Sequence, residues 1–171
     1  MRSALRHSLA ALALALCTAV CACSVSVGDE PGKPEAVRVV RVVDGDTIKV
    51  ALPSGEERVR YIGVDTPESV KPGSPVECFA KRASAFNERL VGGERVKLVR
   101  DVEERDRFGR LLAYVYRERD GLFVNAELVR GGYATVATFP PNVAHEDEFR
   151  RLARTARLSG RGLWGECEGA G

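Results

Sequence analysis

Three short stretches combine carboxylates, arginines and turn residues in patterns that could perform chemistry on a phosphate ester. They are residues 43–47 (VDGDT), 60–68 (RYIGVDTPE) and 106–110 (DRFGR). Short carboxylates bind hard divalent cations through oxygen, and a longer acid can reach a water molecule. The fork of an arginine guanidinium matches the oxygens of a phosphate. Together, the residue types are compatible with metal-assisted attack of water on a phosphate.

Each stretch alone also has an ordinary structural explanation. An Asp-Gly pair between two strands is first of all a hairpin turn, residues 65–68 could be a capped loop, and strand arginines usually pair with acids in solvent. Other chemistries have less support. The chain has no Cys-His cluster at the spacing of a zinc site, and no serine or cysteine has an evident base nearby. His145, at the start of the last predicted helix, is expected to be a cap or surface residue.

The elements that would carry these stretches are short strands followed by helices. Residues 47–52 alternate, and residues 79, 83, 86 and 90 are apolar at helical spacing. Along the third strand we expect Arg58, Arg60, Ile62 and Val64 to share one side. The patterns predict strands at 37–43, 47–52, 56–64, 94–102 and 111–117, and helices at 76–91, 123–130 and 145–158. This order predicts an α+β, mainly β, fold: a five-stranded Greek-key barrel of the OB type with three packed helices.

The N-terminal residues 1–22 have the three parts of an export signal. Arg2 and Arg6 precede an apolar run over residues 9–20, which ends in small residues at Ala22. The run has about 12 residues, fewer than the ~20 of a membrane-spanning helix. Residues 20–24 (VCACS) resemble a bacterial lipobox, which would place lipid on Cys23 and anchor the protein in the envelope. Ordinary cleavage after Ala22 would instead give a secreted protein.

The rest of the chain divides into a linker, one domain and a tail. Residues 23–36 contain Pro and Gly without a hydrophobic period and are predicted to be a flexible linker, residues 37–167 a domain, and residues 168–171 a tail. With Cys17 and Cys21 removed and Cys23 lipidated, Cys78 and Cys167 remain. In an oxidising compartment they are predicted to form a disulfide; two separate buried thiols are the alternative.

Net charge limits how the domain could bind a polyanion. The chain has 26 basic and 24 acidic residues, and the export signal contains two of the arginines and no acid. The mature chain therefore has 24 of each. A neutral domain does not attract nucleic acid through its overall field, so any such affinity must come from local arginines or a metal.

The three stretches together resemble the staphylococcal-type thermonuclease family, over nearly all of residues 37–164. The resemblance includes VDGDT at 43–47, the arginine and VDTPE of 60–68, and the turn at 106–110 that leads into LAYVY. Further matching segments are ASAF at 83–86, the helix around VNAELVRGG, PNVAHE at 141–146 and the late Leu-Trp. The family implies a calcium-dependent nuclease that cuts DNA and RNA by water attack and leaves 3′-phosphate ends. We expect the protein to be a monomer.

The resemblance also implies a role for each matching residue. Asp46 and Asp65 would bind Ca²⁺ through carboxylate oxygens and Thr66 through its carbonyl, with water completing the shell. Asp44 would orient these ligands. Glu68 would activate or position the attacking water, and Arg60 and Arg110 would stabilise charge on the phosphate.

The sequence departs from the family at one place around the substrate. Where the best-known members carry two tyrosines, this chain has Thr138 and Phe139, and Phe139 can offer only a stacking face. Arg107 and Phe108 replace a Lys-Tyr pair. Two alternative functions use the same fold: a catalytically silent nucleic-acid-binding module, and a lipoprotein whose barrel binds an envelope partner while its nuclease residues are idle.

Overall fold

The computed structural model describes residues 36–69 and 75–167. The predicted export signal, Cys23, the linker up to residue 35 and the tail 168–171 lie outside the described residues. In the described part of the chain, no helix is long and apolar enough to cross a membrane.

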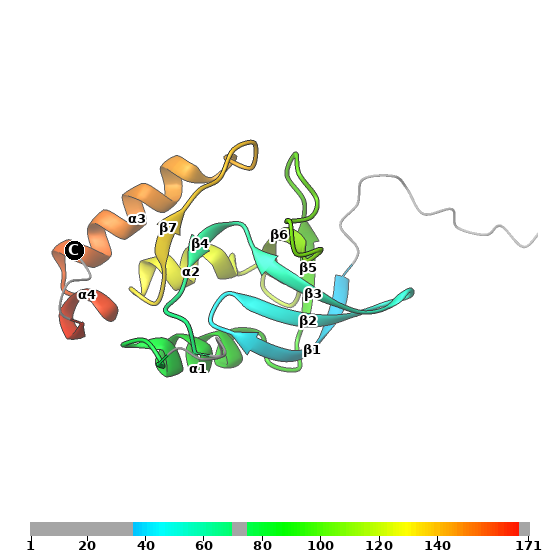
Figure 1. Cartoon of the computed structure of the whole chain (residues 1–171), viewed down its shortest axis with the longest axis horizontal. Helices are drawn as coiled ribbons and strands as arrows, with labels where there is room; N and C mark the ends of the chain where they lie inside the picture. Colours follow the sequence, from blue (N-terminus) through cyan, green and yellow to red (C-terminus); the bar gives the residue numbers. More distant parts are fainter. Residues whose placement is uncertain (1–35, 70–74, 168–171) are drawn as a thin grey trace, which may run out of the picture. The chain divides into compact units, whose positions relative to one another are not determined.

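Five strands form a closed barrel (Figure 1). They are β1 (Ala36–Asp44), β2 (Thr47–Leu52), β3 (Gly55–Tyr61), β5 (Arg95–Val99) and β6 (Leu111–Arg117), arranged in the order β1-β2-β3-β6-β5. Neighbours are antiparallel except β3 and β6, which pair in parallel, and the pairing of β1 with β5 closes the barrel. The predicted α+β fold with an OB-type barrel is confirmed.

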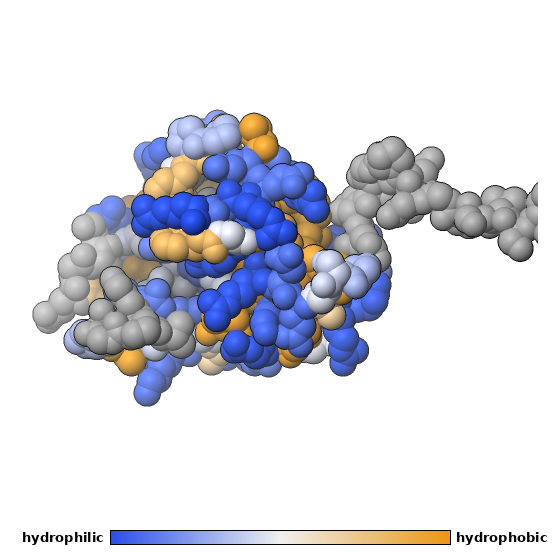
Figure 2. All heavy atoms as spheres, turned by 45° about the vertical axis from the view of Figure 1, so that its right-hand side comes forward, coloured by the Kyte–Doolittle hydropathy of each residue, from blue (hydrophilic) through white to orange (hydrophobic). Residues whose placement is uncertain are grey.

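The barrel interior is filled by side chains that alternate along each strand. Val39, Ile48, Val50, Val59 and Val96 are at most 1% exposed. Their neighbours in sequence point outward, so the outside of the barrel carries many of the charged residues. Figure 2 shows one such face, on which hydrophilic side chains predominate.

In the part of the chain that the structure describes, four helices pack beside the barrel and on one another: α1 (Ala80–Val91), α2 (Val124–Arg130), α3 (Glu146–Leu158) and α4 (Leu163–Glu166). The first three were predicted, but α1 begins four residues later than expected. Phe79 has a left-handed backbone with φ of 69°, which cannot continue a helix. The four-residue α4 is too short to produce a hydrophobic period.

The predicted strand 56–64 is in fact two strands. β3 ends at Tyr61, and after Ile62 the chain continues as β4 (Gly63–Asp65), which pairs with the short strand β7 (Thr135–Ala137) in a second sheet. Gly63 has φ of 77°, and a Cβ there would lie 2.6 Å from the Phe149 ring. Because the backbone turns here, Ile62 and Val64 are buried. The expectation that they share a side with Arg60 is therefore wrong.

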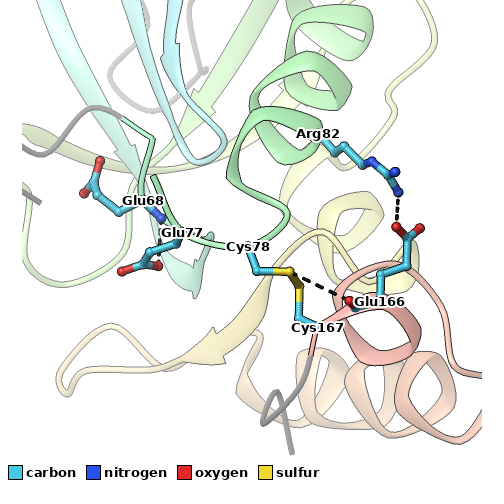
Figure 3. Close-up of a disulfide and its surroundings, with 6 residues drawn as sticks. All are labelled: Glu68, Glu77, Cys78, Arg82, Glu166 and Cys167. Carbon is cyan, nitrogen blue, oxygen red and sulfur yellow. Dashed lines mark hydrogen bonds and ion pairs between the residues drawn. A yellow bond between two sulfur atoms is a disulfide. The ribbon is translucent and has the colours of Figure 1, made fainter. Parts of the chain in front are cut away.

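A disulfide joins Cys78 to Cys167, as predicted, with 6.0 Å between the Cα atoms (Figure 3). It ties the segment before α1 to the residue that follows α4. Arg82 and Glu166 form an ion pair beside it. The two cysteines are 89 residues apart in sequence, and the loop that the disulfide closes includes the barrel strands β5 and β6 and the helices α1 to α4.

Candidate functional site

Asp44 ends β1 and is held from three directions. Its Oδ1 accepts hydrogen bonds from the backbone N of Gly45 at 2.8 Å, from the Ser69 hydroxyl at 2.7 Å and from the Ser84 hydroxyl of α1 at 2.9 Å. Burial acts to raise the pKa of Asp44, but hydrogen bonds from Glu68, Ser69, Gly45 and Ser84 lower it on balance. Asp44 is thus a buried, hydrogen-bonded carboxyl group that links the β1–β2 hairpin to α1.

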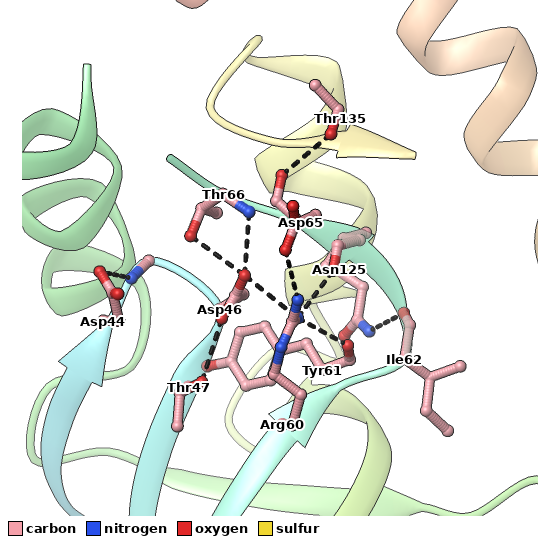
Figure 4. Close-up of polar contacts among 12 residues, drawn as sticks. Asp44, Asp46, Thr47, Arg60, Tyr61, Ile62, Asp65, Thr66, Asn125 and Thr135 are labelled. Atoms are coloured by element: carbon pink, nitrogen blue, oxygen red, sulfur yellow. Dashed lines mark hydrogen bonds and ion pairs between the residues drawn. The ribbon is translucent and has the colours of Figure 1, made fainter. Parts of the chain in front are cut away.

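Asp46 follows the hairpin turn and faces the loop after β4 (Figure 4). Its Oδ2 accepts hydrogen bonds from the backbone N of Thr66 at 2.9 Å and from the Thr66 hydroxyl at 3.1 Å, and its Oδ1 accepts one from the Thr47 hydroxyl at 3.0 Å. A Cβ at Gly45 would lie 2.6 Å from the Thr66 hydroxyl oxygen, so the close approach of turn and loop requires glycine.

Arg60 joins the two predicted metal-binding aspartates. Its guanidinium contacts Asp46 Oδ2 at 3.1 Å and Asp65 Oδ1 at 2.6 Å, and it also donates to the carbonyl of Val64 at 2.7 Å. The Arg60 side chain is only 15% exposed, whereas that of Asp65 is 59% exposed. Asp46 and Asp65 therefore lie within reach of one cationic group, as Figure 4 shows.

The surroundings of Asp65 are rich in negative charge. Burial raises the pKa of the Asp65 carboxyl, Arg60 lowers it, and the neighbouring carboxylates of Asp46, Glu77 and Asp44 raise it further, so that the net shift is upward. Mutual repulsion of this kind is relieved when a cation binds. The electrostatics therefore favour a positively charged ligand beside Asp65.

Glu68 lies at the edge of the same group of acids. Its backbone N donates to Glu77 Oε2 at 2.9 Å, the backbone N of Glu77 donates to the Glu68 carbonyl at 3.1 Å, and its side chain is hydrogen-bonded to Asp44 (Figure 3 shows Glu68 beside Glu77). The next residue after Glu77 is the disulfide-bonded Cys78. The disulfide thus anchors the segment against which Glu68 rests.

Arg110 is positioned by the turn that precedes β6. Asp106 Oδ1 accepts hydrogen bonds from the backbone N of Phe108 at 2.9 Å and of Arg110 at 3.0 Å, and Oδ2 accepts one from Arg110 Nε at 2.7 Å. Burial acts to raise the pKa of Asp106, but these hydrogen bonds and the charge of Arg110 lower it overall. One carboxylate therefore shapes the turn and orients the arginine.

A cleft of about 490 Å³ brings the two arginines together. Arg60 and Arg110 both line it, and Phe108 and the 74% exposed Phe139 add aromatic faces. The Phe108 ring lies under the guanidinium carbons of Arg107, at 4.7 Å, and Arg110, at 5.5 Å. Glu103 and Asp106 also line this cleft, whereas Asp46 and Asp65 lie outside its lining and contact it through Arg60.

The described residues contain no group of three or more His, Cys, Asp or Glu side chains that could hold a metal by itself. Asp46 and Asp65 thus both contact Arg60, whereas the side chain of Glu68 contacts Asp44. The N–H and hydroxyl of Thr66 hold Asp46 in place.

Comparison with known proteins assigns the family. The family model described as staphylococcal nuclease homologue matches residues 58–166. The chain belongs to the staphylococcal nuclease family. It is 35% identical to a thermonuclease of Staphylococcus hyicus over 139 residues, 81% of each chain, and 44% identical to a thermonuclease of Staphylococcus intermedius over 72% of this chain and 70% of that one. It is also 41% identical to the endonuclease YncB of Bacillus subtilis (strain 168), over 75% of this chain and 61% of YncB.

In this staphylococcal nuclease homologue, several residues that support the site were given no role from the sequence. Ser84 and the fully buried Asn87 lie one turn apart on α1, and Asn87 Nδ2 donates to the Asp44 carbonyl at 3.1 Å. Polar residues among the apolar positions of a helix were the available signal. Glu77 had no comparable signal, because its contacts depend on tertiary structure. Asp106 lies in the predicted turn at 106–110 but was given no role of its own.

His145 was expected to be a cap or surface residue. It occupies the N-cap position of α3 but makes no side-chain capping hydrogen bond. Its ring is half-buried, contacts the Tyr114 ring edge-on with 4.5 Å between centroids, and lies 3.0 Å from Glu148 through Nδ1. His145 therefore packs in an aromatic cluster with Tyr114, Phe123 and Phe149.

Proposed function

We propose that this chain is a calcium-dependent nuclease that hydrolyses phosphodiester bonds of DNA and RNA by attack of water and leaves 3′-phosphate ends. The chain is a hydrolase of the nuclease type, as its family and the thermonuclease and endonuclease relatives indicate. The observation that supports the finer proposal best is the position of Arg60. It contacts both Asp46 and Asp65 and lines the cleft that it shares with Arg110.

The donor set around Arg60 suits a hard divalent cation. Every candidate ligand is an oxygen: the carboxylates of Asp46 and Asp65 and the carbonyl of Thr66. We propose that these three residues bind Ca²⁺, with water in the remaining positions, and that Asp44 supports them. When bound, Ca²⁺ supplies positive charge that stabilises the anionic phosphate under attack. Burial is the main cause of the raised pKa of Asp65, and the carboxylates of Asp46, Glu77 and Asp44 add to it, so a cation beside Asp65 would be stabilised.

Residues of the chain itself would bind the phosphate, the attacking water and the bases. Arg60 and Arg110 would donate to the non-bridging oxygens of a phosphate in the cleft, where negative charge grows as water attacks. Glu68 would accept a proton from that water or hold it in place. Phe108 and Phe139 offer faces on which any base can stack, which accords with action on both DNA and RNA.

A cleavage assay tests this proposal. The purified domain is incubated with plasmid DNA and with RNA, first with Ca²⁺ and then with chelator. We expect cleavage only with Ca²⁺, and losses of at least ~100-fold in Glu68→Gln and Arg110→Ala. Glu88→Gln, the same chemical change at an exposed position of α1, is the matched control and should retain full activity.

Other outcomes would contradict particular parts of the proposal. Tight binding without cleavage would indicate the silent nucleic-acid-binding module, and cleavage that survives chelation would exclude a metal role for Asp46 and Asp65. Product ends that a polymerase extends only after phosphatase treatment would establish the 3′-phosphate.

We also propose that the protein is exported, and that Cys23 is lipidated and anchors it in the envelope. The disulfide supports export, because disulfides persist in oxidising compartments. Mass spectrometry of the protein from its native host tests the anchor. Acyl groups on a chain that begins at residue 23 are expected, and an unmodified chain beginning there would indicate a secreted enzyme instead.

A further inference from the structure

Three basic residues lie directly opposite one another on three neighbouring strands of the barrel. Arg41 on β1 pairs in register with Lys49 on β2, and Lys49 pairs with Arg58 on β3. We call Arg41, Lys49 and Arg58 the basic row. Side chains at directly opposite positions have Cβ atoms about 5 Å apart, and like charges there are destabilising. Folding alone therefore does not favour this arrangement.

Neutralisation of the basic row within the protein is incomplete. Lys49 pairs with Glu56 at 2.5 Å, and the Lys49 hydrogen bond and charge together with Arg41 lower the pKa of the Glu56 carboxyl. Among the described residues, the side chains of Arg41 and Arg58 form neither a hydrogen bond nor a salt bridge, although the charge of Arg41 acts on Glu56. Both are exposed. The row thus presents about two uncompensated positive charges on a chain whose basic and acidic residues otherwise balance.

The basic row lies next to the candidate site on the same outer face of the barrel. Thr47 pairs with Arg60 across β2 and β3, and the next pair on that face is Lys49 with Arg58. Two residues along a strand advance about 6.6 Å, roughly the reach from one phosphate to the next in an extended single strand. A strand whose scissile phosphate lies at Arg60 could therefore place a flanking phosphate at the row.

We propose that the basic row is a subsite for the sugar-phosphate backbone of nucleotides flanking the scissile bond. The inference rests on the proposed nuclease function and adds a preference for polynucleotides over short diesters. Contacts to phosphate position a strand without reading its sequence. The basic row thus raises affinity for long single strands, and it leaves the chemistry at Arg60 and Arg110 unchanged.

The test measures binding of a fluorescent 20-nucleotide single strand in chelator, over a series of salt concentrations. Each phosphate contact contributes about 0.7 to the slope of log affinity against log salt. The variant R41Q/K49Q/R58Q should lose about 1.4 from this slope, because Lys49 is already paired with Glu56. Glu56→Gln frees Lys49 and should increase both affinity and slope. The matched control R151Q/R154Q/R157Q, with three exposed arginines of α3 replaced, should change neither.

Activity and stability measurements separate this role from a structural one. The basic-row variant should keep its kcat/KM on a mononucleotide diester, lose at least fivefold on polynucleotide, and melt at the wild-type temperature or above, because like-charge pairs are removed. An unchanged salt slope, or binding of the row to anionic vesicles instead of the oligonucleotide, would overturn the subsite. If the wild type neither binds nor cleaves nucleic acid, the proposed function itself fails.

Discussion

Replacing Arg60 should strengthen calcium binding while it abolishes activity. The Arg60 guanidinium contacts the carboxylates of Asp46 and Asp65 at 3.1 and 2.6 Å, so a cation must compete with it for the same oxygens. A charge-assisted contact is worth about 1.5 kcal/mol where it is largely buried and at most about 1 kcal/mol at an exposed carboxylate such as Asp65. Removing roughly 2 kcal/mol of competition corresponds to about 30-fold tighter calcium binding in Arg60→Gln.

The same substitution should destabilise the metal-free domain. Asp46 is only 8% exposed through its side chain and would lose its cationic partner, which typically costs about 3 kcal/mol when other hydrogen bonds remain. This loss corresponds to a fall of roughly 10 °C in Tm. Saturating Ca²⁺ should raise the Tm of Arg60→Gln by more than it raises the Tm of the wild type. Thermal melts and calorimetric calcium titration measure both effects without relying on activity.

Arg110→Gln is the matched control for the calcium titration. It removes the same charge from the same cleft, but Arg110 pairs with Asp106 and not with the candidate metal ligands. Its calcium affinity should stay within about threefold of wild type, since it has no direct contact with those oxygens. Calcium affinity that is unchanged or weaker in Arg60→Gln would refute the idea that Arg60 and the cation share Asp46 and Asp65.

Four further predictions concern the supports of the site. Asp106→Asn keeps the turn but loses the ion pair to Arg110, so kcat should fall about fivefold, less than in Arg110→Ala. Because the folded-state pKa of Asp106 is lowered, the ion pair contributes fully above the unfolded pKa near 3.9 and is lost as pH falls through the folded-state pKa; the melting temperatures of wild type and variant should converge only there. Reducing the Cys78–Cys167 disulfide should lower the unfolding free energy by about 4 kcal/mol in denaturant titrations. Asn125→Leu breaks buried hydrogen bonds to two backbone groups, each at 2.9 Å, and should cost about 3 kcal/mol by the same measurement. Phe139→Ala should raise KM for polynucleotide several-fold without changing Tm, because the ring is exposed.

The barrel strands were predictable because each satisfies a local rule. Alternation along residues 47–52 places Ile48 and Val50 inside, and the Asp-Gly turn fixes the hairpin before them. The break at Gly63 was not predictable in this way. Its cause is the pairing of β4 with β7, a three-residue strand some 70 residues later that is too short to show a period. Tertiary pairing decided where the third strand ended.

The candidate site likewise has one part that local sequence predicts and another that depends on tertiary pairing. Asp46 and Arg60 meet because β2 and β3 form a hairpin in which Thr47 opposes Arg60, and a hairpin register follows from local sequence. Arg110 reaches the cleft through the parallel pairing of β3 with β6, in which Arg60 opposes Leu112. Spacing alone gives no information on that pairing. From the sequence, only the family resemblance indicated that Arg60 and Arg110 lie close together.

The β2–β3 register has a consequence beyond the fold. It sets Arg60 beside Asp46, and two residues further it sets Arg58 beside Lys49 on the same face. Since side chains alternate with a period of two, a slip of one residue would turn both arginines into the core and bring Val59 outside. The buried Val59 and Tyr61 therefore hold Arg60 and the basic row in one alignment. The apolar core of β3 thus fixes the relative position of the two groups that we propose to bind phosphates.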